Sequence, residues 1–123
     1  MKAHDDYDCD DVVVETNFGG DMVTAVVKQA AQRAFDQGRR STDMLRVKEV
    51  SASRGKVMRA EPCSLLYEKG RVLHRRGLDL LEAEMMSFSR EWSRDADGSP
   101  NRLDAMVWAL TRLCRIITEV PIA

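Results

Sequence analysis

Three consecutive β-branched residues, Val12 to Val14, run directly into the carboxylate Glu15 and constrain the fold of this chain more than any other stretch. A continuous apolar run is typical of a strand covered on both faces, as in the parallel sheet of an α/β protein. A glycine-containing turn, residues 17–20, and a run with helical spacing follow it. Binding sites in such sheets form at the carboxyl ends of the strands, which is where Glu15 stands. Because a buried carboxylate is costly unless it is paired, protonated or bound to a metal, Glu15 needs a partner.

Length and charge place the chain among ordinary soluble domains. Its 123 residues suffice for one domain and carry 19 basic and 20 acidic side chains, a net charge of -1. This balance gives no general argument for binding nucleic acid or a membrane, so any basic footprint must be local. The three cysteines lie far apart, without zinc or disulfide spacing, and predict a reducing cytoplasm. The apolar runs are too short to span a bilayer, and the N-terminus lacks the apolar segment of a signal peptide.

The expected elements follow the order strand, helix, strand, helix, strand, helix, helix. This order indicates an α/β or α+β fold, with the first two strands parallel and joined by a right-handed crossover. The first long helix is expected to bury one stripe, formed by Val23, Val26, Val27, Ala30 and Ala34. Residues 1–10 are expected to form an acidic tail or the end of a helix. The expected strands are residues 11–16, 44–50 and a shorter one over 71–75, and the expected helices are residues 20–35, 61–69 and 78–88. A last helix is expected to have Ser99 as its N-cap and Pro100 in its first position.

Two carboxylates, Glu15 and Asp104, are candidates for chemistry. Asp104 lies near the start of the last expected helix and off its apolar stripe. Taken alone, Glu15 is a strand-end carboxylate that reaches solvent, and Asp104 is a surface residue near a helix N-terminus. If the fold brings acids together around one cavity, they form a hard oxygen site for Mg²⁺ or Mn²⁺. A pair of such ions can activate water and clamp a scissile phosphate.

A basic turn, Arg54-Gly-Lys56, follows the second expected strand, and Arg59 comes shortly after it. The turn is therefore expected at the same end of the sheet as Glu15, where clustered cations would suit a phosphate backbone. A solvated basic loop is an equally good interpretation of these residues. The turn at residues 17–20 has neither GxGxxG nor GK[ST] spacing, which argues against a small nucleotide-binding protein.

Five segments stand in a distinctive order along the chain. They are Val-Val-Val-Glu15-Thr-Asn-Phe-Gly-Gly-Asp-Met-Val, Ala-Ser-Arg-Gly-Lys56 with Arg59-Ala-Glu-Pro62, Leu-Tyr-Glu-Lys-Gly-Arg-Val72, Leu-Glu-Ala-Glu-Met85, and Ser-Pro-Asn-Arg-Leu-Asp104-Ala-Met-Val-Trp-Ala-Leu110. Over about residues 8–113, this series resembles the C-terminal nuclease domain of tailed-phage terminase large subunits, including those of prophage-like and gene-transfer-agent packaging systems. The Glu-Thr-Asn-x-Gly-Gly and Ser-Pro-x-Arg-x-Asp-Ala segments are its most distinctive parts.

The resemblance implies a partial RNase H-like α/β fold over residues 11–118, followed by a short tail over residues 119–123. It implies a metal-dependent endonuclease that uses Mg²⁺ or Mn²⁺ to hydrolyse phosphodiester bonds of concatemeric double-stranded viral DNA during packaging, in the cytoplasm of a bacterial host. The family's strand-end acid maps onto Glu15 and its last-helix acid onto Asp104. Its basic turn maps onto Arg54 and Lys56, with Arg59 as a further DNA contact. The portal and the small terminase subunit are other partners that the resemblance suggests.

One departure from the family changes what is expected of the chain by itself. The family has an earlier acid, on the first of three strands that precede the Glu15 strand, and a large ATPase domain before them. This sequence starts just ahead of the Glu15 strand, so these parts are expected to be absent or supplied by an upstream chain. Two acids instead of three predict weak metal binding and weak or no cleavage. The uncovered strand edge predicts self-association. The alternative is a catalytically inactive prophage remnant that binds DNA or packaging proteins.

Overall fold

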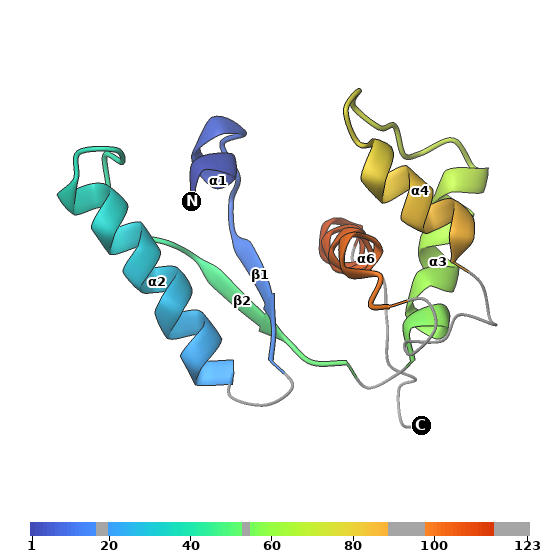
Figure 1. The fold of residues 1–123 in the computed structure, drawn as a ribbon, viewed down its shortest axis with the longest axis horizontal. Coiled ribbons are helices and arrows are strands. Elements are labelled where there is room, and N and C mark those ends of the chain that lie inside the picture. The colour runs from blue at the N-terminus through green and yellow to red at the C-terminus, as the bar shows by residue number, and fades with distance from the viewer. Residues whose placement is uncertain (17–19, 53–54, 89–97, 115–123) are drawn as a thin grey trace. The chain divides into compact units, whose positions relative to one another are not determined.

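The computed structural model describes residues 1–16, 20–52, 55–88 and 98–114 (Figure 1). The chain divides into two compact units, Met1–Ala52 and Ser53–Ala123, and each is described by itself. In the part of the chain that is described, no helix has both the length and the apolar character needed to cross a membrane.

The first unit is built on two parallel strands joined through a helix. It contains α1 (Lys2–Asp6), β1 (Val12–Glu15), α2 (Gly20–Asp36) and β2 (Val47–Val50). Val12 pairs with Val47 and Glu15 with Val50, so the register runs without a slip along both strands. The parallel pair and the connecting helix confirm the α/β prediction, although both strands are shorter than their apolar patterns suggest.

The alternation of side chains gives the two-stranded sheet two different faces. Val14 is buried and pairs with Glu49, and paired residues point to the same face. Thr24 of α2 donates a hydrogen bond to the Glu49 carboxylate, so α2 covers this face. Glu15 follows Val14 directly and therefore points to the opposite face.

α2 turns a different face to the sheet than its apolar pattern predicts. Ala31 and Ala34 are fully buried, whereas Val23 and Val26 are exposed, Val26 by 59 %. Ala30, also part of the expected stripe, is exposed as well. Of the predicted stripe, Ala34 is buried and Val27 half-buried, so the prediction is correct in part.

The described residues of the second unit form three helices, α3 (Lys56–Glu68), α4 (Asp79–Ser87) and α6 (Asn101–Leu113). α6 packs against both α3 and α4 (Figure 1). The core of this unit is a cluster of buried residues with partly buried side chains around it: Cys63, Leu103 and Val107, surrounded by Ala60, Met85, Phe88, Met106 and Leu110.

α3 begins at Lys56, well before the predicted start at Glu61. Pro62 therefore lies inside the helix, where it removes one backbone hydrogen bond, and not in the first turn. Burial along one face explains why the helix continues through the proline; the buried residues are Arg59, Cys63 and Leu66. α6 begins at Asn101 with Pro100 in the N-cap position, one residue later than predicted, which is within the usual spread of helix boundaries.

The segment after α3 does not form the third strand that the sequence predicts. Gly70 ends α3 as expected, in the left-handed conformation with φ of 68°. Residues 71–75 then pair with no strand in the described part of the chain. Side chains hold them instead: the Tyr67 hydroxyl lies 2.6 Å from His74 Nε2, and His74 Nδ1 lies 3.2 Å from a Glu82 carboxylate oxygen.

Candidate functional site

Asp104, in the first turn of α6, contacts two cations of α3. The Lys56 ammonium lies 3.1 Å from Asp104 Oδ2, and a guanidinium nitrogen of Arg59 lies 2.9 Å from Oδ1. Lys56 and Arg59 are three positions apart and so share one face of α3. These three residues, called the Asp104 cluster below, connect the first turns of two helices in the second unit.

Arg59 is the buried member of the cluster. Its side chain is 4 % exposed, and its guanidinium carbon lies 5.1 Å from the centre of the Trp108 ring. Trp108 follows Asp104 by four positions, so α6 presents a carboxylate and an aromatic ring on one face, one turn apart. A buried cation is tolerated only where such partners compensate its charge. The sequence pattern gave no indication that Arg59 would be buried, because arginine usually stays at the surface.

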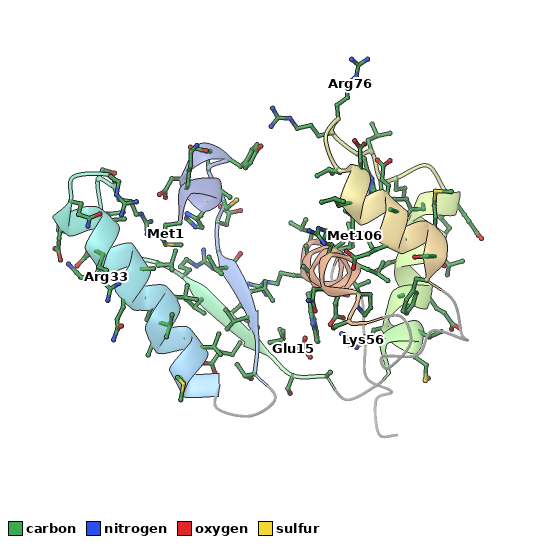
Figure 2. All side chains as sticks on the ribbon, in the orientation of Figure 1. Met1, Glu15, Arg33, Lys56, Arg76 and Met106 are labelled. Carbon is green, nitrogen blue, oxygen red and sulfur yellow. The ribbon has the colours of Figure 1, made fainter. Side chains whose placement is uncertain are left out.

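Lys56 is the exposed member of the cluster. Its side chain is 40 % exposed, against 14 % for that of Asp104. Besides the carboxylate, the ammonium reaches the Ser99 hydroxyl at 3.4 Å, just ahead of α6. Figure 2 shows Lys56 at the first turn of α3. Of the three predicted DNA-contacting residues, Lys56 and Arg59 thus lie beside a predicted metal ligand, and Arg54 lies outside the described residues.

A second carboxylate, Glu84 of α4, acts at the N-terminus of α6. One of its oxygens accepts a hydrogen bond from the Arg102 backbone N–H at 3.2 Å, and the other lies 3.3 Å from the Arg102 guanidinium. A negative charge at this end of a helix is favourable because the helix dipole is positive there. Glu84 therefore fixes α4 to the turn that carries Asp104, a role that no pattern in the sequence indicated.

Glu15 ends β1 in the first unit and is partly exposed (Figure 2). The residue after it continues the contact with β2, since Thr16 N donates a hydrogen bond to Val50 O at 2.8 Å. The prediction that Glu15 stands at the carboxyl end of a parallel strand is correct. Asp104 belongs to the other unit, and the pairing of the two acids in one site stays a prediction.

The residues around Asp104 do not fit a divalent metal as they stand. Each oxygen of the carboxylate already faces a side-chain cation. Among the residues that the structure describes, no group of three His, Cys, Asp or Glu side chains could hold a metal ion. A metal at Asp104 would therefore require at least one of the cations to move.

Comparison with known proteins adds the decisive observation. The family model described as terminase RNaseH-like domain matches residues 1–113. The chain belongs to this family. No curated protein and no solved structure gave a significant match.

The family is the one that the sequence motifs suggested, and the two parallel strands with their helices are consistent with a partial RNase H-like fold of this terminase domain.

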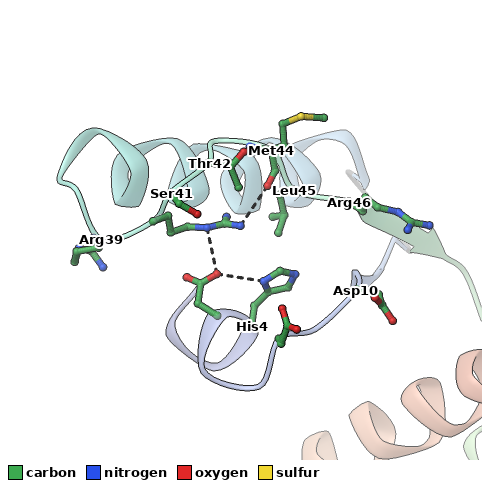
Figure 3. A pocket seen from close by; sticks show the side chains of 11 residues that line it. His4, Asp10, Arg39, Ser41, Thr42, Met44, Leu45 and Arg46 are labelled. Carbon is green, nitrogen blue, oxygen red and sulfur yellow. Dashed lines mark hydrogen bonds and ion pairs between the residues drawn. The ribbon is translucent and has the colours of Figure 1, made fainter.

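The match to the terminase RNase H-like domain begins at residue 1 and so includes α1. An ion pair ties α1 to the loop after α2, because Arg40 Nε lies 3.2 Å from Asp5 Oδ1. A cavity of about 540 Å³ opens between them (Figure 3). Its lining mixes basic with acidic residues, which does not suit a phosphate backbone.

The surroundings of Tyr67, in the second unit, change the pKa of its hydroxyl. Burial raises the pKa of the Tyr67 hydroxyl, and the nearby Cys63 and Glu82 add to the shift. The hydroxyl also lies 2.9 Å from the sulfur of Met106. A raised pKa disfavours the phenolate, so Tyr67 is suited to hold the segment after α3 and not to act as a nucleophile.

Proposed function

We propose that this terminase RNase H-like domain is part of the metal-dependent DNA endonuclease of a viral DNA-packaging terminase large subunit, and hydrolyses phosphodiester bonds of concatemeric DNA. The observation that carries the proposal is the family match over residues 1–113. A carboxylate at the end of a parallel strand supports it, because sites in such sheets form there.

Glu15 and Asp104 are the acids proposed to bind Mg²⁺ or Mn²⁺. Carboxylate oxygens are the ligands that these hard ions prefer. When bound, such ions supply an activated water and stabilise the charge on the phosphate. Arg59 orients the Asp104 carboxylate through its hydrogen bond to Oδ1.

Lys56 and Arg54 are the proposed contacts to the DNA backbone, and Arg59, the third residue predicted to bind DNA, lies beside Lys56 at Asp104. Lys56 suits this role because its ammonium is partly exposed and compact, as a phosphate contact requires. Arg59 is largely enclosed by Asp104 and Trp108, so its contribution to DNA binding is expected to be its charge and not a direct contact.

A plasmid-nicking assay in Mg²⁺ or Mn²⁺ tests the proposal. We expect weak, metal-dependent nicking at high protein concentration, because a metal at Asp104 must displace a cation from a carboxylate whose two oxygens both face one. Glu15→Gln and Asp104→Asn should each abolish it, with folding checked by circular dichroism. Nicking that survives chelation or both substitutions would contradict the proposed site.

The second candidate function is a DNA- or packaging-protein-binding module without cleavage. The observation that favours it is the Asp104 carboxylate, whose two oxygens face cations. Such a module would bind double-stranded DNA, the portal or the small terminase subunit. Binding to DNA that weakens steeply with added salt, without any nicked product in Mn²⁺, would favour this candidate.

A further inference from the structure

We propose that Lys56 competes with a divalent ion for Asp104, so that metal binds this carboxylate only when the Lys56 ammonium leaves it. The proposal rests on the proposed role of Asp104 as a metal ligand. Lys56 Nζ lies 3.1 Å from Oδ2, where it occupies the side of the carboxylate that Arg59 leaves open. Two cations on one oxygen repel each other, so the ammonium and the metal exclude one another at Oδ2.

Burial decides which of the two cations leaves. Arg59 is 4 % exposed, bonded to Oδ1 at 2.9 Å and placed over the Trp108 ring. Moving its guanidinium would separate a buried charge from the carboxylate that compensates it, which is strongly unfavourable. Lys56 is 40 % exposed and carries its charge on a flexible stem. Lys56 is therefore the cation that can leave.

The surroundings of Lys56 offer the ammonium another place. Its Nζ already reaches the Ser99 hydroxyl at 3.4 Å, and Ser99 is exposed. Lys56 can move from the carboxylate toward Ser99 and solvent without becoming buried and unpaired. In the absence of metal, the same ammonium pairs with Asp104 and so joins α3 to α6.

Direct measurement of Mn²⁺ binding tests this inference without relying on cleavage. Electron paramagnetic resonance of free Mn²⁺ would be followed during titration of the 123-residue chain and its Lys56→Met variant. Methionine keeps a similar stem and removes the charge. We expect Lys56→Met to bind Mn²⁺ more tightly, on the order of tenfold, because the repulsion at Oδ2 is gone.

Two control variants separate this effect from a general change in charge. Lys56→Arg keeps the cation and should not gain affinity. Lys69→Met removes one positive charge at the other end of α3 and should leave Mn²⁺ affinity within about twofold of the original value, because exposed charges far apart are screened.

Asp104→Asn distinguishes failure of this inference from failure of the proposed function. If Asp104→Asn abolishes Mn²⁺ binding and Lys56→Met does not strengthen it, the competition is wrong and the metal ligand stands. If Asp104→Asn leaves binding unchanged, or if neither the original chain nor Lys56→Met binds Mn²⁺, both the competition and the assigned ligand are wrong.

Discussion

At the scale of single residues, the second unit depends on one buried charge. Arg59 is enclosed by the Asp104 carboxylate and the Trp108 ring, two residues that lie one turn apart on α6. Removing Arg59 would leave Asp104, only 14 % exposed, with the longer contact to Lys56 alone, and breaking a buried pair from one side is costly. Arg59 should therefore matter to stability as well as to the orientation of Asp104.

Arg59→Met should lower the free energy of unfolding by about 3 kcal/mol, because Asp104 loses its shorter ion pair and Trp108 loses its cation. Arg59→Lys keeps the charge and should lose less. Urea unfolding followed by tryptophan fluorescence measures both. Arg71→Met, an exposed arginine beyond the end of α3, is the matched control and should change stability by less than about 0.5 kcal/mol. Equal effects at Arg59 and Arg71 would contradict the buried charge.

At the scale of elements, α3 carries both cations of the Asp104 cluster, and a glycine in the left-handed conformation lies just beyond its end. Gly70 has φ of 68°, and the Arg71 N–H that follows it donates to Leu66 O at 3.0 Å. This bond satisfies a carbonyl group at the end of the helix that would otherwise lack a partner. Gly55 precedes the same helix with φ of -62°.

Gly70→Ala should destabilise the chain by about 1–2 kcal/mol, because an L-residue is strained in the left-handed region. Gly55→Ala offers the comparison, since an added Cβ meets nothing within 4 Å at either glycine. Gly55 is the N-cap of α3 and has φ of -62°, which alanine adopts without strain, so Gly55→Ala should cost less than Gly70→Ala. Thermal unfolding of both variants measures the difference. A loss of stability that is the same at both positions would contradict the assigned helix end.

Elements of the fold differ in how far the sequence predicts them. β1, α2 and β2 follow from local patterns: a valine run, a helical stripe and a second apolar segment. The start of α3 does not, because Pro62 is most common in a first turn and here lies inside the helix. The third strand was expected from Val72 and Leu73, but side-chain contacts of His74 hold that segment.

The contacts of the candidate site could not be predicted from the sequence. Position and family motif propose Glu15 and Asp104 as its acids, and that assignment stays a prediction. The pairing of Arg59 with Asp104 joins residues 45 positions apart, and no local pattern records such a contact. Burial of Arg59 depends on it, so the sequence predicted an exposed DNA contact where the structure has an enclosed cation.

At the scale of the whole molecule, the two-stranded sheet is the feature that most affects stability and association with other chains. In the described residues it contains only β1 and β2, so each strand has one edge without a neighbouring strand. Two-stranded sheets are marginally stable in water, and free edges can pair with other chains. A second copy of this chain is a partner of this kind.

We therefore predict that the isolated chain self-associates as its concentration rises. Size-exclusion chromatography with light scattering would report the mass, and hydrogen exchange would report protection of β1. Self-association should protect the amides of Val12–Glu15 more strongly at high concentration. A monomer at all concentrations, with β1 already well protected, would contradict this prediction.

The central claim is that Glu15 and Asp104 are the acids of a metal-dependent nuclease. Mn²⁺-dependent nicking of supercoiled plasmid tests it most directly when Asp104→Asn is compared with Asp79→Asn, which changes an aspartate in the first turn of α4. We predict weak nicking that stops on chelation, disappears in Asp104→Asn and Glu15→Gln, and persists in Asp79→Asn. Equal nicking by the original chain, Asp104→Asn and Glu15→Gln would contradict the claim.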